Sequence, residues 1–197
     1  MTTSRIPDGI GPLRRRILEV GLHELDLGVH EVPWGSNRGP RVDVYLPKWA
    51  RKRPGPPWCA WFVTWVLEQA LGEVPTGARR GGCEMLRSDA IRTQLWCPKG
   101  DVAPGELRPI PGDLFWMDTD GNTGNKGHVG IVLRVSEDFS EISTIEGNSG
   151  QGVRLGHRVL SDPRIRGFIN TVRSEPNADF ELGLGVKGED VGAKSTR

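Results

Sequence analysis

The apolar positions in the first half of the chain repeat with the spacing of α-helices. Between residues 12 and 27 they fall three or four residues apart, which predicts an amphipathic helix in spite of Gly21. A second segment, from about residue 58 to residue 70, carries larger apolar side chains at the same spacing. Its core-facing positions are Trp58, Trp61, Phe62, Trp65 and Val66. We expect this second segment to be the central helix of the fold.

Shorter elements are predicted around these two helices. Residues 42–49 favour a short helix, with Ser36 or Asn37 placed to cap its start, and residues 84–95 favour another. After residue 112 the pattern changes to short β runs separated by turn-rich segments. The predicted strands are 113–117, 127–135, 141–146 and 166–172. Helices followed by strands indicate an α+β fold in which the central helix packs on an antiparallel sheet.

The length and composition favour one folded domain. A chain of 197 residues with seven Trp and five Phe can bury a sizeable core without disulfide bonds. We expect residues 1–11 to form an N-terminal extension and residues 12–173 to form the domain. Residues 174–197 are rich in Gly, Glu and Lys, which predicts a flexible C-terminal tail.

The charge balance and the apolar runs limit the partners. Lys and Arg number 26 against 25 Asp and Glu, so the net charge of +1 provides no field for binding nucleic acid. No apolar run is long enough for a signal-peptide core or a membrane span. We therefore expect synthesis in the cytoplasm and no membrane insertion. A monomer is expected as well, although the sequence carries no direct signal of the oligomeric state. If the target lies outside the membrane, release or secretion must follow another route.

The three cysteines differ in what they predict. Cys59, Cys83 and Cys97 are too few and too irregularly spaced for a disulfide framework or a standard zinc site, although a Cys83–Cys97 disulfide stays open. Cys59 falls in the predicted first turn of the central helix. The helix dipole and the unpaired N–H groups of that turn both favour a thiolate, which is the form that attacks carbonyl carbon. Cys59 is therefore predicted to be a nucleophile.

A cysteine nucleophile needs a base and a group that orients the base. Among the four histidines, His128 is the best candidate because it opens the most apolar strand, where Gly127 and Gly130 allow another backbone to approach closely. Considered alone, a histidine in a sheet is more often a structural, hydrogen-bonded residue. Glu146 and Asn148 end the next strand and share one face if that strand is extended, so either can accept the second ring N–H of His128.

Four short motifs occur in one order along the chain. They are Pro57-Trp-Cys-Ala-Trp-Phe-Val63, Pro111-Gly-Asp-Leu-Phe115, Gly127-His-Val-Gly-Ile-Val132 and Ile145-Glu-Gly-Asn148. Over residues 13–172 the chain thereby resembles the CHAP family, the cysteine, histidine-dependent amidohydrolases/peptidases. The resemblance implies a papain-like fold with Cys59 as nucleophile, His128 as base, and Glu146 and Asn148 as orienting and polar site residues.

The same resemblance suggests residues that contact a substrate. The segment Val29-His-Glu-Val-Pro-Trp-Gly-Ser-Asn-Arg-Gly39 looks like the N-terminal part of members that act on peptidoglycan. We expect Trp34, Asn37, Trp58 and Trp61 to bind substrate, although Asn37, like Glu31, also suits a structural turn. Trp61 stands where relatives carry a small residue, so the cleft is either narrowed or repacked at that position.

The implied chemistry is acyl transfer on an amide of bacterial peptidoglycan, with neither a metal nor an organic cofactor. The bond is either the one between muramic acid and L-alanine or one within the peptide stem or bridge. Competing readings are a catalytically silent CHAP-like wall-binding or structural module of a phage or secretion apparatus, and an amidase on a soluble peptide conjugate. Residues 118–122 place oxygen ligands at alternate positions, as calcium loops do, but a hairpin turn is favoured because they lack the rest of an EF-hand.

Overall fold

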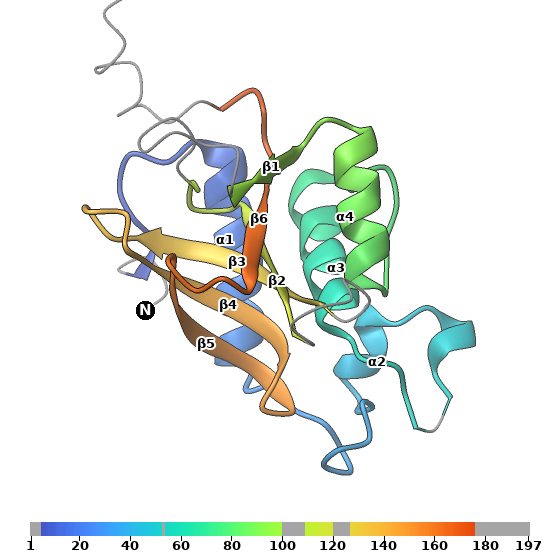
Figure 1. Ribbon diagram of the computed structural model, residues 1–197. Coiled ribbons are helices and arrows are strands. Elements are labelled where there is room, and N and C mark those ends of the chain that lie inside the picture. The colour runs from blue at the N-terminus through green and yellow to red at the C-terminus, as the bar shows by residue number, and fades with distance from the viewer. Residues whose placement is uncertain (1–4, 53, 100–108, 120–126, 176–197) are drawn as a thin grey trace, which may run out of the picture.

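A computed structural model describes residues 5–52, 54–99, 109–119 and 127–175. The helices come first along the chain, and the strands follow (Figure 1). The helical elements are α1 (Pro12–Asp26), α2 (Val42–Tyr45), the 3₁₀ turn η2 (Lys48–Ala50), α3 (Cys59–Leu71) and α4 (Cys83–Arg92). The strands are β1 (Trp96–Pro98), β2 (Leu114–Asp118), β3 (Gly127–Val135), β4 (Glu141–Ser149), β5 (Gly152–Val159) and β6 (Ile165–Ile169).

The strands form one antiparallel sheet in the order β1-β6-β2-β3-β4-β5. Helices α1 and α3 pack against each other, and both contact β3 and β4 in the middle of the sheet. This arrangement confirms the predicted α+β class, with the central helix beginning at Cys59 and packed on an antiparallel sheet.

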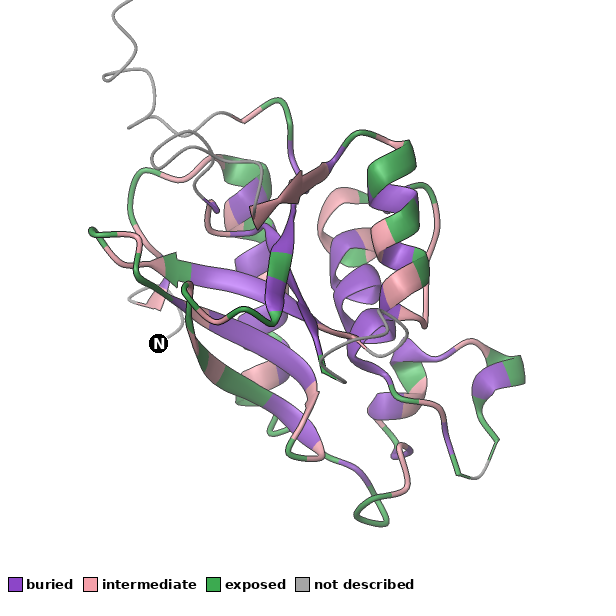
Figure 2. Ribbon diagram, in the orientation of Figure 1, coloured by how far each residue is buried: buried purple, intermediate pink, exposed green. Residues whose placement is uncertain are grey.

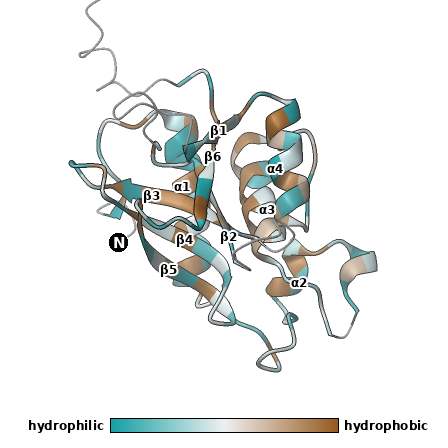
Figure 3. Ribbon diagram, viewed as in Figure 1, coloured by the Kyte–Doolittle hydropathy of each residue, from teal (hydrophilic) through white to brown (hydrophobic). Residues whose placement is uncertain are grey.

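The core lies on both faces of the sheet. Strand β2 is buried at all five residues (Figure 2), and the neighbouring strand β3 is largely hydrophobic (Figure 3). Alternate side chains of β2 enter two different apolar clusters. Leu114 and Trp116 join the larger cluster, which includes most of α3, whereas Phe115 and Met117 belong to a smaller cluster with residues of β3, β4 and β6. Burial on both faces explains why the sequence of this strand is a continuous apolar run instead of an alternating pattern.

Buried polar contacts fix α1 to the sheet. Arg14 is 1% exposed and donates to Asp113 just before β2 at 2.7 Å, and to the side-chain oxygen of Asn170 at 3.0 Å. The carboxylate of Glu175 accepts the backbone N–H groups of Leu13 (2.8 Å) and Arg14 (3.1 Å) at the start of the helix. Glu175 thus acts as a cap from a distant part of the chain, at the beginning of the segment expected to be a flexible tail. Residues 176–197 of that segment lie outside the described residues.

Several predicted boundaries are corrected by the structure. Helix α2 begins at Val42 with Arg41 before it, so neither Ser36 nor Asn37 caps it. Helix α4 ends at Arg92, and the chain turns at Gln94, which has a positive φ of 57°. Strands β1 and β5 were not predicted. Strand β5 was missed because three of its side chains are charged or ionisable and its surface is largely exposed, which is typical of an edge strand.

Candidate active site

Cys59 is the first residue of α3, and its side chain lies at the floor of a cleft. The residue before it, Trp58, is fully buried, stacks on Tyr45 with ring centroids 5.7 Å apart, and donates its indole N–H to Glu31 Oε1 at 3.0 Å. Because Trp58 is held on both sides, the entry of the chain into α3 is fixed. The sulfur of Cys59 therefore has a defined position at the N-terminal end of the helix.

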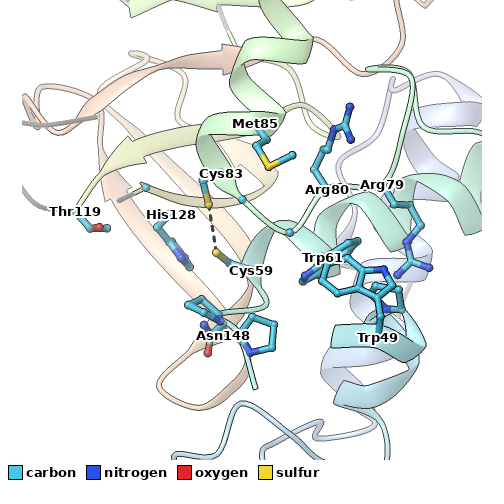
Figure 4. Close-up of a pocket in the computed structure, with 16 residues that line it drawn as sticks. Trp49, Cys59, Trp61, Arg79, Arg80, Cys83, Met85, Thr119, His128 and Asn148 are labelled. Carbon is cyan, nitrogen blue, oxygen red and sulfur yellow. Dashed lines mark hydrogen bonds between the residues drawn. The ribbon is translucent and has the colours of Figure 1, made fainter. Parts of the chain in front are cut away.

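His128 lies beside Cys59, at the start of β3 (Figure 4). Its Nε2 is 2.8 Å from Glu146 Oε2, and the ring also hydrogen-bonds the Cys59 sulfur. Since Nε2 is engaged by Glu146, Nδ1 is the ring nitrogen that faces the sulfur. The predicted partners thus meet as a cysteine, a histidine and a carboxylate, and Glu146 rather than Asn148 accepts the second ring N–H.

Glu146 is held by a set of contacts that sequence reasoning missed. Arg158 on β5 donates to both carboxylate oxygens, through Nε to Oε1 at 3.0 Å and through Nη2 to Oε2 at 2.5 Å. Thr144 Oγ1 donates to Oε1 at 2.6 Å. A Cβ at Gly156 would come within 2.1 Å of Oε1, so only glycine leaves room for this carboxylate. The carboxylate is fully buried, and its charge is compensated by Arg158 and His128.

These contacts set the charge state of the site. A hydrogen bond from Cys83 lowers the pKa of Cys59 well below its ordinary value; burial opposes this change, and His128 reinforces it. Burial alone would lower the pKa of His128, but its hydrogen bonds to Cys59 and Glu146 raise it to about 9. Burial tends to raise the pKa of Glu146, yet His128 and Arg158 lower it to about 2. These shifts favour the thiolate form of Cys59, the imidazolium form of His128 and the carboxylate form of Glu146.

The cleft above Cys59 has a volume of about 900 Å³. On one side it is lined by His128 and by Asn148, which has a positive φ of 58° at an irregular point of β4. On the other side it is lined by Trp61, which is 8% exposed, and Trp49, which is 71% exposed. The two rings meet edge to face, 6.0 Å apart. Trp49 was not predicted as a site residue, because nothing in the sequence separates it from the other apolar residues of its short helix.

The other residues expected to bind substrate lie elsewhere. Trp58 was predicted wrongly as a substrate contact, since burial inside the core separates its ring from the cleft. Asn37 has a structural role: its N–H donates to Glu31 Oε2 at 2.8 Å, and its side chain donates to the carbonyl of Gly55. Trp34 is 65% exposed, and it is not among the residues that line the described cleft.

Trp61 is accommodated by a glycine in the adjacent loop. A Cβ at position 81 would lie 2.1 Å from the Trp61 indole nitrogen, so Gly81 provides the space for the ring. The guanidinium of Arg79 covers the ring at 5.8 Å from its centroid. The large residue next to the nucleophile thus forms part of the cleft wall instead of filling the cleft.

Two further expectations involve cysteine and metal chemistry. All three cysteines are free, and Cys83 faces Cys59 with the two sulfurs 3.4 Å apart, so Cys83 and Cys97 do not form a disulfide in this structure. Of the suggested calcium loop, residues 120–122 lie outside the described residues. Within the described part of the chain, no group of three or more His, Cys, Asp and Glu side chains could hold a metal ion.

The fold brings together the thiol of Cys59, the imidazole of His128 and the carboxylate of Glu146, an arrangement that can activate a nucleophile for acyl transfer. In the comparison with protein families, residues 51–148 match the sequence model of the CHAP domain, and the fold of the described residues is consistent with the papain-like fold of that domain. CHAP domains are typically cysteine amidohydrolases or peptidases. A search of curated proteins and a search of solved structures each found no match. Among the described residues, no helix is long and apolar enough to span a membrane.

Proposed function

We propose that this protein is a peptidoglycan hydrolase that cleaves an amide bond through Cys59, His128 and Glu146. The bond is either the N-acetylmuramoyl-L-alanine amide or an amide within the peptide stem or bridge. The main support is the position of His128, which bridges the Cys59 sulfur and the buried carboxylate of Glu146 at the floor of an open cleft. A histidine–carboxylate pair with a purely structural role would not require a thiol at a helix N-terminus beside it.

In the first half of the reaction, the Cys59 thiolate attacks the amide carbonyl carbon and forms a tetrahedral intermediate. The negative charge moves to the carbonyl oxygen, beside the first turn of α3. The N–H groups of that turn have no partner within the helix, so they are available to stabilise the oxyanion. The proton on His128 then passes to the leaving amine, and the C–N bond breaks to give a thioester on Cys59.

In the second half, His128 is neutral and accepts a proton from water. The resulting hydroxide attacks the thioester carbonyl, and the acid product leaves as the Cys59 thiolate and the imidazolium are restored. Glu146 does not transfer a proton in this scheme. It fixes the ring orientation of His128 and favours its charged form, as its hydrogen bond and its fully buried charge suggest.

The form of the cleft supports a bulky substrate. Its volume of about 900 Å³ suits several linked groups rather than one small amide. We propose that Trp49 and Trp61 form an aromatic wall for the sugar or stem next to the scissile bond, and that Asn148 supplies a polar contact. A substrate on the cell wall also agrees with the CHAP domain, which suggests peptidoglycan as the substrate.

The test is to incubate purified protein with peptidoglycan sacculi and to identify the soluble products by mass spectrometry. Cys59→Ala and His128→Ala should release nothing while keeping the wild-type circular dichroism. Cys97→Ala, a cysteine change on β1 outside the cleft, should match the wild type. Release of stem peptides or muropeptides would name the bond. Intact sacculi with the wild type would overturn the proposal and favour a silent module or a soluble amide substrate.

A further inference from the structure

A second thiol lies next to the proposed nucleophile. Cys83 is the first residue of α4, is 7% exposed, and places its sulfur 3.4 Å from that of Cys59 (Figure 4). This separation is within hydrogen-bonding reach for sulfur. The two thiols are 24 positions apart in the sequence and meet because the N-terminal ends of α3 and α4 converge at the cleft floor.

The position of Cys83 is fixed by its surroundings. Its backbone carbonyl accepts the indole N–H of Trp116 at 3.0 Å, which ties the start of α4 to β2. A Cβ at Gly127 would lie 3.0 Å from the Cys83 Cβ, so β3 passes close to this residue just before His128. Cys83 therefore has little freedom to turn away from Cys59.

The two sulfurs cannot both be ionised at this distance, because two adjacent thiolates would repel each other in a buried place. One must keep its proton, and the surroundings decide which. His128 hydrogen-bonds Cys59 and supplies a positive charge there. The Cys59 sulfur and burial raise the pKa of Cys83, and the neighbouring Glu84 adds to this effect. These surroundings favour Cys83 as the protonated partner of the pair.

Other charged groups near the pair are already engaged. Glu146 stands behind His128 and does not face the sulfurs. Arg79 and Arg80 line the same cleft from the loop before α4, but they pair with Glu68 and Asp89 respectively.

We infer that Cys83 is a positioning residue for the reaction: its thiol stays protonated and donates a hydrogen bond to the Cys59 thiolate. This inference rests on the proposed function, because it assigns Cys83 a role toward the same nucleophile. The hydrogen bond stabilises the thiolate and holds the sulfur at one point of the cleft floor. His128 and Cys83 then approach the sulfur from β3 and α4, leaving the cleft side for the substrate.

The test measures the rate at which iodoacetamide alkylates Cys59 between pH 4 and pH 10, with the labelled cysteine identified by peptide mass spectrometry. This readout needs no knowledge of the substrate. In Cys83→Ala the acid limb of the Cys59 rate profile should lie about one pH unit higher on the pH axis. At a given pH on that limb, alkylation should therefore be about tenfold slower than in the wild type. Cys83→Ser, which keeps a donor, should restore most of the rate, and Cys97→Ala should leave the profile unchanged.

An unchanged acid limb in Cys83→Ala would overturn the inference, as would a Cys83→Ser profile equal to that of Cys83→Ala. Circular dichroism of each variant controls for folding. If Cys83→Ala does not fold, the comparison of Cys83→Ser with the wild type decides the question. Intact sacculi combined with a shifted acid limb would reject the proposed substrate alone, whereas hydrolysis with an unshifted limb would reject only the role of Cys83.

Discussion

Replacement of Arg158 by methionine tests whether the second hydrogen-bonding partner of Glu146 stabilises the fold. Methionine keeps an apolar side chain over the Phe115 ring, which the guanidinium covers at 5.6 Å, but it removes both hydrogen bonds to the carboxylate. Glu146 is fully buried, whereas the side chain of Arg158 is 26% exposed. Among the described residues, the variant therefore leaves the buried carboxylate with His128 and Thr144 as its hydrogen-bonding side chains.

The size of the effect follows from the burial of the pair. Removing one partner of a fully buried ion pair costs about 3–5 kcal/mol of unfolding free energy. Arg158 is partly solvated and the positive charge of His128 remains, so we expect a loss of about 2 kcal/mol. For a domain of this size, that loss lowers the melting temperature by roughly 4–8 °C.

The loss should also depend on pH. The pKa of Glu146 is about 2 in the folded protein, against an ordinary value of 4.5. A lowered carboxyl pKa gives stability that is complete above the unfolded pKa and disappears as the pH falls through the folded one. The difference between wild type and Arg158→Met should therefore be constant above about pH 5 and shrink between pH 4.5 and pH 2.

The assay is urea unfolding of the full chain, followed by circular dichroism at a series of pH values from 7 down to 3. Arg154→Met is the matched control, because Arg154 lies on the same strand and is exposed. The reasoning is refuted if Arg158→Met is no less stable than Arg154→Met at pH 7, or if their difference does not shrink on acidification.

Three further outcomes are expected. Glu146→Gln should keep the fold but lower the rate of sacculus hydrolysis by less than roughly 100-fold, which is the low end of what a general base contributes. A complete loss of hydrolysis would contradict a purely orienting role of Glu146. The pH–rate profile of the wild type should be bell-shaped, rising as Cys59 ionises and falling near pH 9 as His128 loses its proton; Glu146→Gln should move the alkaline limb to lower pH. Trp58→Phe should lower the unfolding free energy by about 2 kcal/mol in chemical denaturation, because it removes a hydrogen bond to the buried carboxylate of Glu31, and an unaltered midpoint would contradict this role.

The sequence predicted the parts of the fold in which apolar spacing is strong. The helix beginning at Cys59 and the strand beginning at Gly127 were predicted because most of their residues enter the core. Strand β1 has only three residues, and β5 is an edge strand with exposed charges, so neither gives a clear pattern.

The sequence predicted those residues of the candidate site that stand in short local motifs. Cys59, His128 and Glu146 each stand in a short motif, whereas Arg158 and Cys83 join them only through tertiary contacts. The spacing of Cys83 resembles no standard pair, and Arg158 lies on the missed strand. Periodicity also failed to separate Trp58 from Trp61, because both fall at core-facing positions of the predicted segment 58–70. Only packing decides which of the two rings reaches the cleft.

The contacts of Glu146 and Trp58 determine how much of the chain can be moved as a portable unit. The CHAP match covers residues 51–148, but two residues that support the site lie outside it. Arg158 donates to Glu146, and Glu31 accepts the indole N–H of Trp58. Helix α1, which Glu175 caps, covers the sheet from an earlier part of the chain. A fusion designed around the matched segment alone would leave Glu146 without its arginine and the sheet without two of its strands. A transplantable version has to extend from α1 through Glu175.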